Sequence, residues 1–214
     1  MITESMLEKL RGELATKMSP KRYRHTVEVE RMAERLGKLY APDKIPVLRA
    51  AALLHDLTKE YSADRQLMIC AQQSLTVSRC DLYAPKTFHA RTAAALIPAQ
   101  YPDFADEEIL SCVRWHTTGR AGMTLCEQLI YLADYIDLSR TFEDCVTLRN
   151  FFFDANPEAM TETERLAHLR DTLILSFDMT IRALLAEGTP ISADTLEARN
   201  ELVCRRLDER TADR

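Results

Sequence analysis

The sequence predicts an all-α protein, and three observations favour that fold class. Apolar residues recur at helical spacing along almost the whole chain of 214 residues. Only five glycines and eight prolines interrupt this pattern, and no segment shows the alternation of apolar and polar residues typical of a half-buried strand. A hydrophobic content of 46% is enough to fill one sizeable core. We therefore expect a single domain over residues 1–214, with its core at about 19–150 and peripheral C-terminal helices at about 157–207.

The first expected helix begins at Ser19-Pro20. Serine is favoured at a helix N-cap because its hydroxyl accepts a backbone N–H, and proline is favoured at the first helical position. This helix runs to about Tyr40. The next helix runs from Pro46 to Asp56 and is apolar on nearly every side, which predicts that it is buried.

Six further helices follow from the same periodicity. The fourth of the eight is rich in alanine, which permits close packing, and glycines mark the turn after the fifth and the end of the seventh. The six cover Asp64–Gln72, Phe88–Ile97, Asp106–Trp115, Leu125–Leu138, about Pro157–Ala186 and about Ala193–Leu207.

Charge and cysteine usage narrow the class of partner and compartment. The formal net charge is −5 and no long Lys/Arg run occurs, so nucleic acid is not expected as the main partner. An anionic substrate would then need positive charge supplied locally, by a metal or a few placed cations. No stretch approaches the roughly 20 apolar residues of a membrane span, and Met1–Arg11 lacks the apolar core of a secretory signal. We expect a cytoplasmic protein whose six scattered cysteines are reduced thiols.

His55 and Asp56 close the most apolar helix of the chain. An unpaired carboxylate at that position would carry a large desolvation cost. A metal ion or a firm hydrogen-bond network would remove the cost. Because adjacent helical residues diverge by about 100°, such a pair at a helix end can reach two metal ions.

Four more residues have a similar placement. His25, His89, His116 and Asp134 each lie on the apolar stripe of a different helix, whereas His168 has polar neighbours and is expected on a solvated face. Taken alone, a histidine on such a stripe is more often a hydrogen-bonded core residue than a ligand, and Asp134 alone would do equally well as a helix-to-helix hydrogen-bond partner. Together they form the order H…HD…H…H…D, which favours a hydrolytic metal site.

This order resembles the signature of the HD-domain superfamily of metal-dependent phosphohydrolases, and the surrounding segments are similar to those of the YqeK family, which hydrolyses dinucleoside tetraphosphates symmetrically. The resemblance spans about residues 20–200 and implies an HD-type helical bundle with a C-terminal helical extension. The segments that carry it are RYRHT at 22–26, AALLHDLTK at 51–59, RWHTTGRAG at 114–122, IYLADYIDLSR at 130–140 and DTLEARN at 194–200.

The resemblance implies two divalent or trivalent metal ions, with iron expected and Mn, Co, Ni or Zn also compatible with the donor set. A metal-bridging hydroxide would attack phosphorus and cut diadenosine tetraphosphate into two ADP. Asp56 would bridge the ions. The implied ligands are His25, His55, Asp56 and Asp134, shared between the two ions, with His89 and His116 completing one site.

Candidate substrate contacts surround these ligands. Lys59 lies one turn after His55 and is a candidate phosphate ligand and catalytic residue together with Asp56; its alternative is a solvated cation at a helix end. A Thr-Thr-Gly turn can offer hydroxyl and N–H groups to phosphate, and arginine can bind phosphate bidentately. Arg120 and Arg140 could equally be surface residues, and Tyr23 could pack in the core instead of stacking on a base. The substrate-binding set is Tyr23, Lys59, Thr117, Thr118, Gly119, Arg120 and Arg140.

Two segments depart from the family pattern. Asp137-Leu138 stands where Glu-Pro is expected, which keeps an acidic residue but loses a helix-stopping proline. Residues 62–88 match poorly. Two other functions stay open: a different HD phosphohydrolase, such as a nucleotidase or phosphodiesterase, and a nucleotide-binding regulatory protein. We expect the partners to be a small dinucleoside polyphosphate and its ADP product, with no nucleic acid and no membrane, in a monomer or homodimer.

Overall fold

The computed structural model describes residues 2–212. Over this range the chain forms helices and turns without a strand, which confirms the all-α prediction. The α-helices are α1 (Glu4–Lys17), α2 (Pro20–Tyr40), α3 (Ile45–Leu54), α4 (Ala63–Gln72), α5 (Arg79–Leu82), α6 (Phe88–Gln100), α7 (Glu107–Trp115), α8 (Leu125–Ile136), α9 (Glu143–Asp154), α10 (Glu162–Ala186) and α11 (Ala193–Ala212), and the short 3-10 helices are η1 (Pro42–Lys44), η2 (Pro85–Thr87), η3 (Pro102–Phe104) and η4 (Pro157–Ala159).

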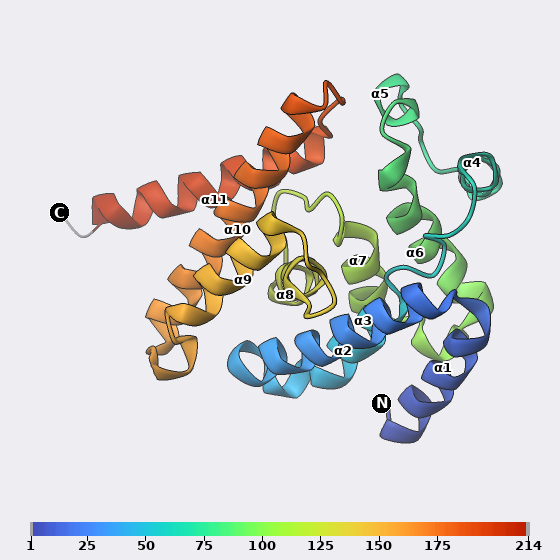
Figure 1. The fold of residues 1–214 in the computed structure, drawn as a ribbon, viewed down its shortest axis with the longest axis horizontal. Helices are drawn as coiled ribbons and strands as arrows, with labels where there is room; N and C mark the ends of the chain where they lie inside the picture. Colours follow the sequence, from blue (N-terminus) through green and yellow to red (C-terminus); the bar gives the residue numbers. More distant parts are fainter. Residues whose placement is uncertain (1, 213–214) are drawn as a thin grey trace.

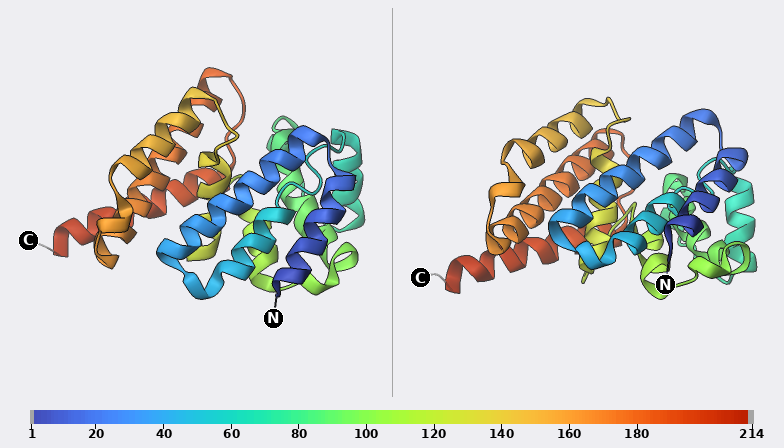
Figure 2. Two further views of the ribbon diagram at one scale, coloured as in Figure 1. Left: turned by 60° about the horizontal axis from the view of Figure 1, so that its bottom comes forward. Right: turned by 90° about the horizontal axis from the view of Figure 1, so that it is seen from below.

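Five helices form the centre of the molecule. α3 packs between α2 and α7, α8 packs against α2 and α7, and α6 covers the far side of α7. Helices α9, α10 and α11 form a layer at one side of this centre, and α4 and α5 lie at the opposite side (Figures 1 and 2). The centre therefore consists of helices whose ends and inner faces can meet at one place.

The helix starts follow the expected chemistry. Ser19 caps α2 by accepting a hydrogen bond from the backbone N–H of Arg22, and Pro20 occupies the first turn. α3 is fully buried from Ala50 to Leu54, as its apolar sequence predicts. The chain continues past Leu54 in a series of turns rather than as a helix, so the apolar segment delivers the next residues into the interior.

Several expected boundaries were wrong. α8 ends at Ile136 instead of Leu138, α10 begins at Glu162 after η4, and α11 continues to Ala212. Three α-helices were missed: α1, α5 and α9. α1 is held by an apolar stripe of Leu7, Leu10 and Leu14, which are almost completely buried.

Glu30 on α2 anchors α1 electrostatically. Its carboxylate, 4% exposed, accepts hydrogen bonds from Arg11 on α1 at 2.7 Å and from Arg49 on α3 at 2.9 Å. A buried carboxylate needs such charged partners, because desolvation would otherwise be costly. The ion pairs therefore join three helices around one buried charge.

His168 is half-buried, which corrects the expectation of a solvated face. Its Nε2 lies 2.9 Å from the carbonyl oxygen of Phe152, and its ring stacks on Phe151 and Phe152. The neighbours on α10 are polar, but α9 covers this side of the helix. The sequence stripe could not reveal this because α9 was itself missed.

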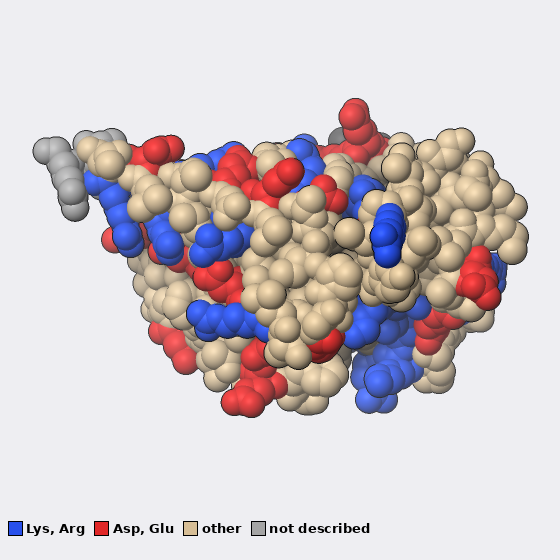
Figure 3. Space-filling model, turned by 90° about the horizontal axis from the view of Figure 1, so that it is seen from above, with Lys and Arg blue, Asp and Glu red and all other residues tan. Residues whose placement is uncertain are grey.

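All six cysteines lie within the described chain and none forms a disulfide, in agreement with the expected free thiols. Cys112 and Cys126 are buried in the core, as expected for packing residues. Among residues 2–212, no helix combines the length and apolar character required to cross a bilayer. Acidic and basic side chains are interspersed on the face seen from above (Figure 3).

Candidate metal centre

The six expected ligands converge in the centre of the five-helix core. His25 lies in the second turn of α2, and His89 is the second residue of α6. His55 and His116 are the C-caps of α3 and α7, where the helix carbonyls favour a bound cation. The two carboxylates are Asp56, directly after His55, and Asp134, in the last turn of α8.

Asp56 lies at the middle of the cluster. Its Oδ2 is 3.4 Å from Nε2 of His55 and 3.6 Å from Nε2 of His25. Its Oδ1 is 3.3 Å from Nε2 of His89 and 3.9 Å from Nε2 of His116. One carboxylate oxygen therefore faces each half of the cluster, which is the arrangement needed for a residue that bridges two metal ions.

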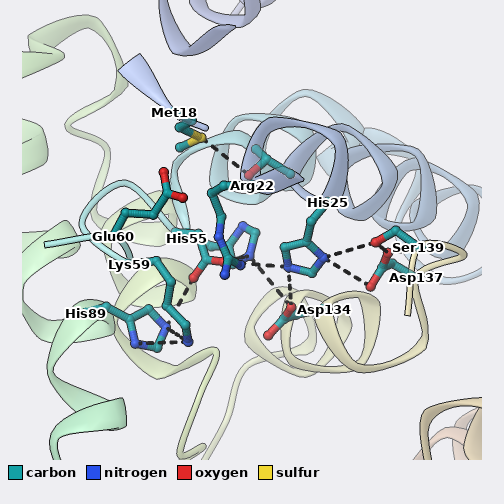
Figure 4. A network of polar contacts seen from close by, with 12 residues as sticks. Met18, Arg22, His25, His55, Lys59, Glu60, His89, Asp134, Asp137 and Ser139 are labelled. Atoms are coloured by element: carbon teal, nitrogen blue, oxygen red, sulfur yellow. Dashed lines mark hydrogen bonds and ion pairs between the residues drawn. The ribbon is translucent and has the colours of Figure 1, made fainter. Parts of the chain in front are cut away.

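Asp134 closes one half of the cluster. Its Oδ1 lies 3.0 Å from Nε2 of His25 and 3.7 Å from Nε2 of His55 (Figure 4). The same oxygen contacts Arg140, which also donates from Nε to the backbone carbonyl of Asp134. Arg140 thus lies at the edge of the centre, as expected, with its side chain 29% exposed.

The imidazoles are oriented by hydrogen bonds outside the cluster. Nδ1 of His55, His89 and His116 lies 2.6, 2.8 and 2.7 Å from the carbonyl oxygens of the residues three positions earlier. A carbonyl oxygen can only accept, so each Nδ1 carries the proton and each Nε2 presents a lone pair. This tautomer is the one expected of metal-bound histidine.

Two lone pairs face each other where His89 and His116 meet. Their Nε2 atoms are 2.9 Å apart, and neither has a proton to donate in the tautomer that the carbonyls impose. The Nε2 atom of His55 is also buried without a hydrogen-bond partner, whereas Nε2 of His25 faces the carboxylate of Asp134 at 3.0 Å. Buried acceptors that face one another are costly, and a cation between them would satisfy the Nε2 atoms of His55, His89 and His116.

The donor geometry fits metal ions in two places. His25, His55 and Asp134 present ligand atoms within 4.8 Å of one another, and so do His55, Asp56 and His116. The two groups share His55, and His89 lies beside the second group, with its Nε2 2.9 Å from that of His116. Imidazole and carboxylate donors suit Fe, Mn or Zn rather than Ca or Mg. These residues therefore fit a pair of transition-metal ions.

The charges within the cluster support the same interpretation. Burial alone would raise the pKa of Asp56, but the neighbouring His55, His89 and Lys59 hold it well below its usual value. Burial would likewise raise the pKa of Asp134, and Arg140 and His25 lower it instead. Both carboxylates are therefore ionised and available as ligands.

The histidines divide by their surroundings. Burial lowers the pKa of His116 to about 4 and that of His89 well below its usual value. Burial also acts to lower the pKa of His25, but its contacts with Asp134 and Asp137 outweigh this and raise the pKa to about 9.

Lys59 reaches the cluster from the turn that follows Asp56. Its Nζ lies 3.1 Å from Nε2 of His89, and burial lowers its pKa despite the opposing charges of Asp56 and Asp134 (Figure 4). Lys59 therefore lies within the centre and is not the solvated helix-end cation considered as the alternative.

Three residues beside the ligands were missed by the sequence interpretation. Arg22 contacts Asp56, and its Nε is buried without a partner. Asp137, fully buried, has Oδ2 3.3 Å from Nδ1 of His25, and the Oγ of Ser139 is 3.4 Å from the same nitrogen. A signal existed for two of them: Arg22 lies one helical turn before His25, and Asp137 is the acidic residue at the departure from the family pattern.

The turn after α8 needs no proline because Arg149 on α9 holds it. Its guanidinium donates to the carbonyl oxygens of Ile136, Asp137 and Arg140. These are the carbonyls at and beyond the C-terminus of α8, which lack partners in the helix itself. The backbone at Asp137 is extended and Leu138 points outward, 63% exposed.

The Thr-Thr-Gly turn is only partly at the centre. Thr117 Oγ1 lies 3.1 Å from Nε2 of His89. Thr118 is buried, and its hydroxyl donates to the carbonyl of Gly119. Gly119 has φ +63°, and a Cβ there would lie 2.7 Å from the ring of Phe177, so glycine is required for the turn and for packing.

The two remaining candidates do not contact the ligands. Arg120 forms an ion pair at 3.1 Å with Glu127, a fully buried residue of α8 that also caps that helix. Tyr23 is half-buried and packs against the hydrophobic core. The structure thus brings Lys59, Thr117 and Arg140 to the metal centre and leaves Arg120 and Tyr23 outside it.

Comparison with known families agrees with this centre. The family model described as HD domain matches residues 22–139, more than half of the chain. The matched region begins at Arg22 and ends at Ser139, so it contains all six expected ligands and the residues that orient His25.

Curated relatives extend the similarity to most of the chain. The symmetrical bis(5'-nucleosyl)-tetraphosphatase of Halalkalibacterium halodurans is 31% identical over 182 residues, which are 85% of this chain and 89% of that protein. The protein of the same name from Bacillus subtilis is 32% identical with the same coverage. That of Staphylococcus aureus is 32% identical over 69% of this chain and 75% of its own length.

A solved structure shows the same fold. It is the crystal structure of a predicted HD superfamily hydrolase involved in NAD metabolism from Clostridium acetobutylicum, 30% identical to this chain. The TM-score is 0.79, and the match covers 92% of this chain and 97% of that one. The C-terminal helices are therefore part of the shared architecture.

Proposed function

Since this chain belongs to the HD domain family and to the family of symmetrical bis(5'-nucleosyl)-tetraphosphatases, we propose that it hydrolyses diadenosine tetraphosphate to two ADP. The observation that supports this best is the pair of facing Nε2 lone pairs of His89 and His116, 2.9 Å apart beside Asp56. An interior with four imidazoles and two ionised carboxylates is suited to holding metal ions and to little else.

We propose that the six ligands hold two metal ions, with iron as the native metal. When bound, the ions activate water near neutral pH and neutralise the charge that develops on the phosphate oxygens. Asp56 has one oxygen toward each group of histidines and would serve both ions. The ligands are His25, His55, Asp56, His89, His116 and Asp134.

The cations at the edge of the centre bind and orient the polyphosphate. Lys59 and Arg140 extend toward Asp56 and Asp134, and Arg22 contacts Asp56 from α2. Once these carboxylates engage metal ions, the three side chains can turn their N–H groups to phosphate oxygens. Thr117 adds a hydroxyl beside His89. We also propose that Thr118 and Gly119 act indirectly, by shaping the turn that carries Thr117. Tyr23 and Arg120 would contact parts of the substrate farther from the metal ions.

Product analysis tests the proposed reaction. Metal-loaded protein incubated with diadenosine tetraphosphate should release ADP alone, because symmetrical cleavage breaks the bond between the second and third phosphates. ATP plus AMP would contradict the symmetrical reaction. Release of inorganic phosphate from a nucleoside monophosphate, with the dinucleotide untouched, would instead identify a nucleotidase.

A matched pair of variants links the activity to the centre. His55→Ala should abolish turnover, because His55 contributes to both ligand groups. His168→Ala removes the one histidine outside the cluster and should keep the turnover of the parent protein. Tight ADP binding by the parent protein without any turnover would favour a regulatory nucleotide-binding protein.

Metal analysis tests the choice of iron. Protein purified without oxygen should contain about two iron ions per chain, as the six-ligand centre implies. The same donors also accept zinc, so zinc is a real alternative. Stoichiometric zinc with full activity would contradict the proposal that iron is the native metal.

A further inference from the structure

A cavity of about 240 Å³ opens beside the metal centre. One wall is the segment from Tyr83 to Thr87, between α5 and α6, and the opposite wall comes from the end of α10 and the start of α11. Thr117 and Thr118 form the base between them. In Figure 1, α5 and the connection between α10 and α11 project to the same end of the molecule.

The cavity adjoins the ligand His89 on two sides. The carbonyl oxygen of Lys86, on one wall, lies 2.8 Å from Nδ1 of His89. The hydroxyl of Thr117, at the base, lies 3.1 Å from Nε2 of the same ring. A molecule bound at the metal ions can therefore continue directly into this cavity.

The lining of the cavity suits an uncharged aromatic and polar group. Lys86 and Glu187 are its only charged members, of opposite sign, and no arginine is present. The remaining lining combines apolar surface with seven serine and threonine side chains. These residues are Thr87, Thr117, Thr118, Thr180, Thr189, Ser192 and Thr195.

Tyr83 supplies an aromatic surface at the mouth. The residue is 65% exposed, so its ring is accessible to a bound group. The helix that precedes it is fixed in place: Ser78 and Asp81 form a capping box, and Arg91 on α6 forms a bidentate ion pair with Asp81 at 3.0 Å. A base inserted beside Tyr83 would find a ring held by a rigid element.

We infer that this cavity binds one nucleoside of the substrate, with the base against Tyr83 and the ribose near the hydroxyl-rich wall. This assignment rests on the proposed function. Symmetrical cleavage leaves each nucleoside two phosphates from the reacting bond, so its site must adjoin the metal ions without including them. The volume is below the roughly 300–1,000 Å³ of pockets for drug-sized ligands, which suits one nucleoside and not two.

Direct binding measurements on the metal-loaded protein test the inference, with ADP and inorganic pyrophosphate as probes. Tyr83→Ala should weaken ADP binding about tenfold, the scale of base–aromatic stacking. Tyr83→Phe should keep the affinity of the parent protein. Leu82→Ala, an exposed apolar neighbour on α5 outside the cavity, is the matched control and should also keep it. Pyrophosphate affinity should be equal in all four proteins.

A second variant probes the opposite wall. Leu184→Trp places a larger side chain in the cavity from α10 and should reduce ADP binding while pyrophosphate binding persists. The retained pyrophosphate binding shows that the variant is folded and metal-loaded.

Two outcomes would overturn the inference. ADP affinity unchanged in both Tyr83→Ala and Leu184→Trp would show that the nucleoside lies elsewhere. Parallel loss of ADP and pyrophosphate affinity in Tyr83→Ala would show an effect on the metal centre instead. If the parent protein fails to cleave diadenosine tetraphosphate but ADP binding depends on Tyr83, the proposed function falls and the nucleoside site stands.

Discussion

His25 is oriented differently from the other histidines of the metal centre. Backbone carbonyls hold Nδ1 of the other three rings, whereas Nδ1 of His25 faces the carboxylate of Asp137 and the hydroxyl of Ser139. A carboxylate behind an imidazole makes it a stronger ligand and fixes its orientation. We therefore expect the affinity of one metal position to depend on Asp137, which is not among the proposed ligands.

Asp137→Asn tests this dependence. The substitution keeps the shape of the side chain but removes the charge behind His25, so metal affinity should fall about 10- to 100-fold. Competition with a chelator of known affinity measures the change. Leu138→Ala alters the next residue, which is exposed, and should leave the affinity unchanged. Equal affinity in Asp137→Asn and the parent protein would show that Asp137 only shapes the turn.

Metal binding should release a proton from His25. Its pKa is raised to about 9 without metal, so it is protonated at pH 7.5 and must become neutral to bind, whereas His116, with a pKa of about 4, is already neutral. Metal affinity should fall as the pH drops below about 9. Titration calorimetry in buffers of different ionisation enthalpy should detect about one proton per chain; no proton release would contradict the role of His25.

The same raised pKa has a consequence for the metal-free fold. Protonated His25 contributes stability that is fully present below its usual pKa of 6.5 and is lost as the pH rises through about 9. Bound metal replaces this contribution, because a ligated imidazole no longer carries the proton.

At the scale of elements, α9 holds the end of α8. Arg149 donates to three carbonyls of the turn that carries Asp137 and Arg140. Arg149→Ala should lower the free energy of unfolding by about 2–3 kcal/mol, the scale of hydrogen bonds from a charged donor. Urea unfolding measures the loss, with Asn150→Ala on the exposed face of α9 as control. Equal stability of the two variants would exclude Arg149 as a clamp.

The ligand-bearing elements could be predicted from the sequence because burial and chemistry coincide in them. His55 and Asp56 follow a helix that is apolar on all sides. Burying an imidazole and a carboxylate there costs free energy unless they have partners, which indicates a site. The positions of His25 and Asp134 follow from the same apolar stripes. What these stripes could not specify is how far apart the side chains lie, because that depends on the packing of five helices.

The remaining parts depend on contacts between segments distant in sequence. The three leucines of α1 form a local stripe that the sequence does contain, but the pairing of Arg11 with Glu30 joins two helices and no local pattern reveals it. α9 and the role of Arg149 depend on the carbonyls of another helix. The approach of Thr117 to His89, 28 positions away, likewise became apparent only from the fold.

At the scale of the whole molecule, the metal centre joins α2, α3, α6, α7 and α8. Ions bound there stabilise the folded chain because the ligands do not converge in the unfolded chain. Metal at 100 times its dissociation constant should add about 2.7 kcal/mol to the free energy of unfolding. Thermal melting with and without a chelator should show this shift as one cooperative transition over the single domain. An unchanged melting temperature would contradict binding at this centre.

The order of the ligands along the chain has a kinetic consequence. His25 and Asp134 enclose about half of the sequence, and His25 and Ser139 are 114 positions apart. Bringing such distant segments together costs loop-closure entropy before any contact compensates for it. The complete set of six ligands therefore exists only after the helices have docked, late in folding. Bound ions should then lower the unfolding rate and leave the folding rate unchanged.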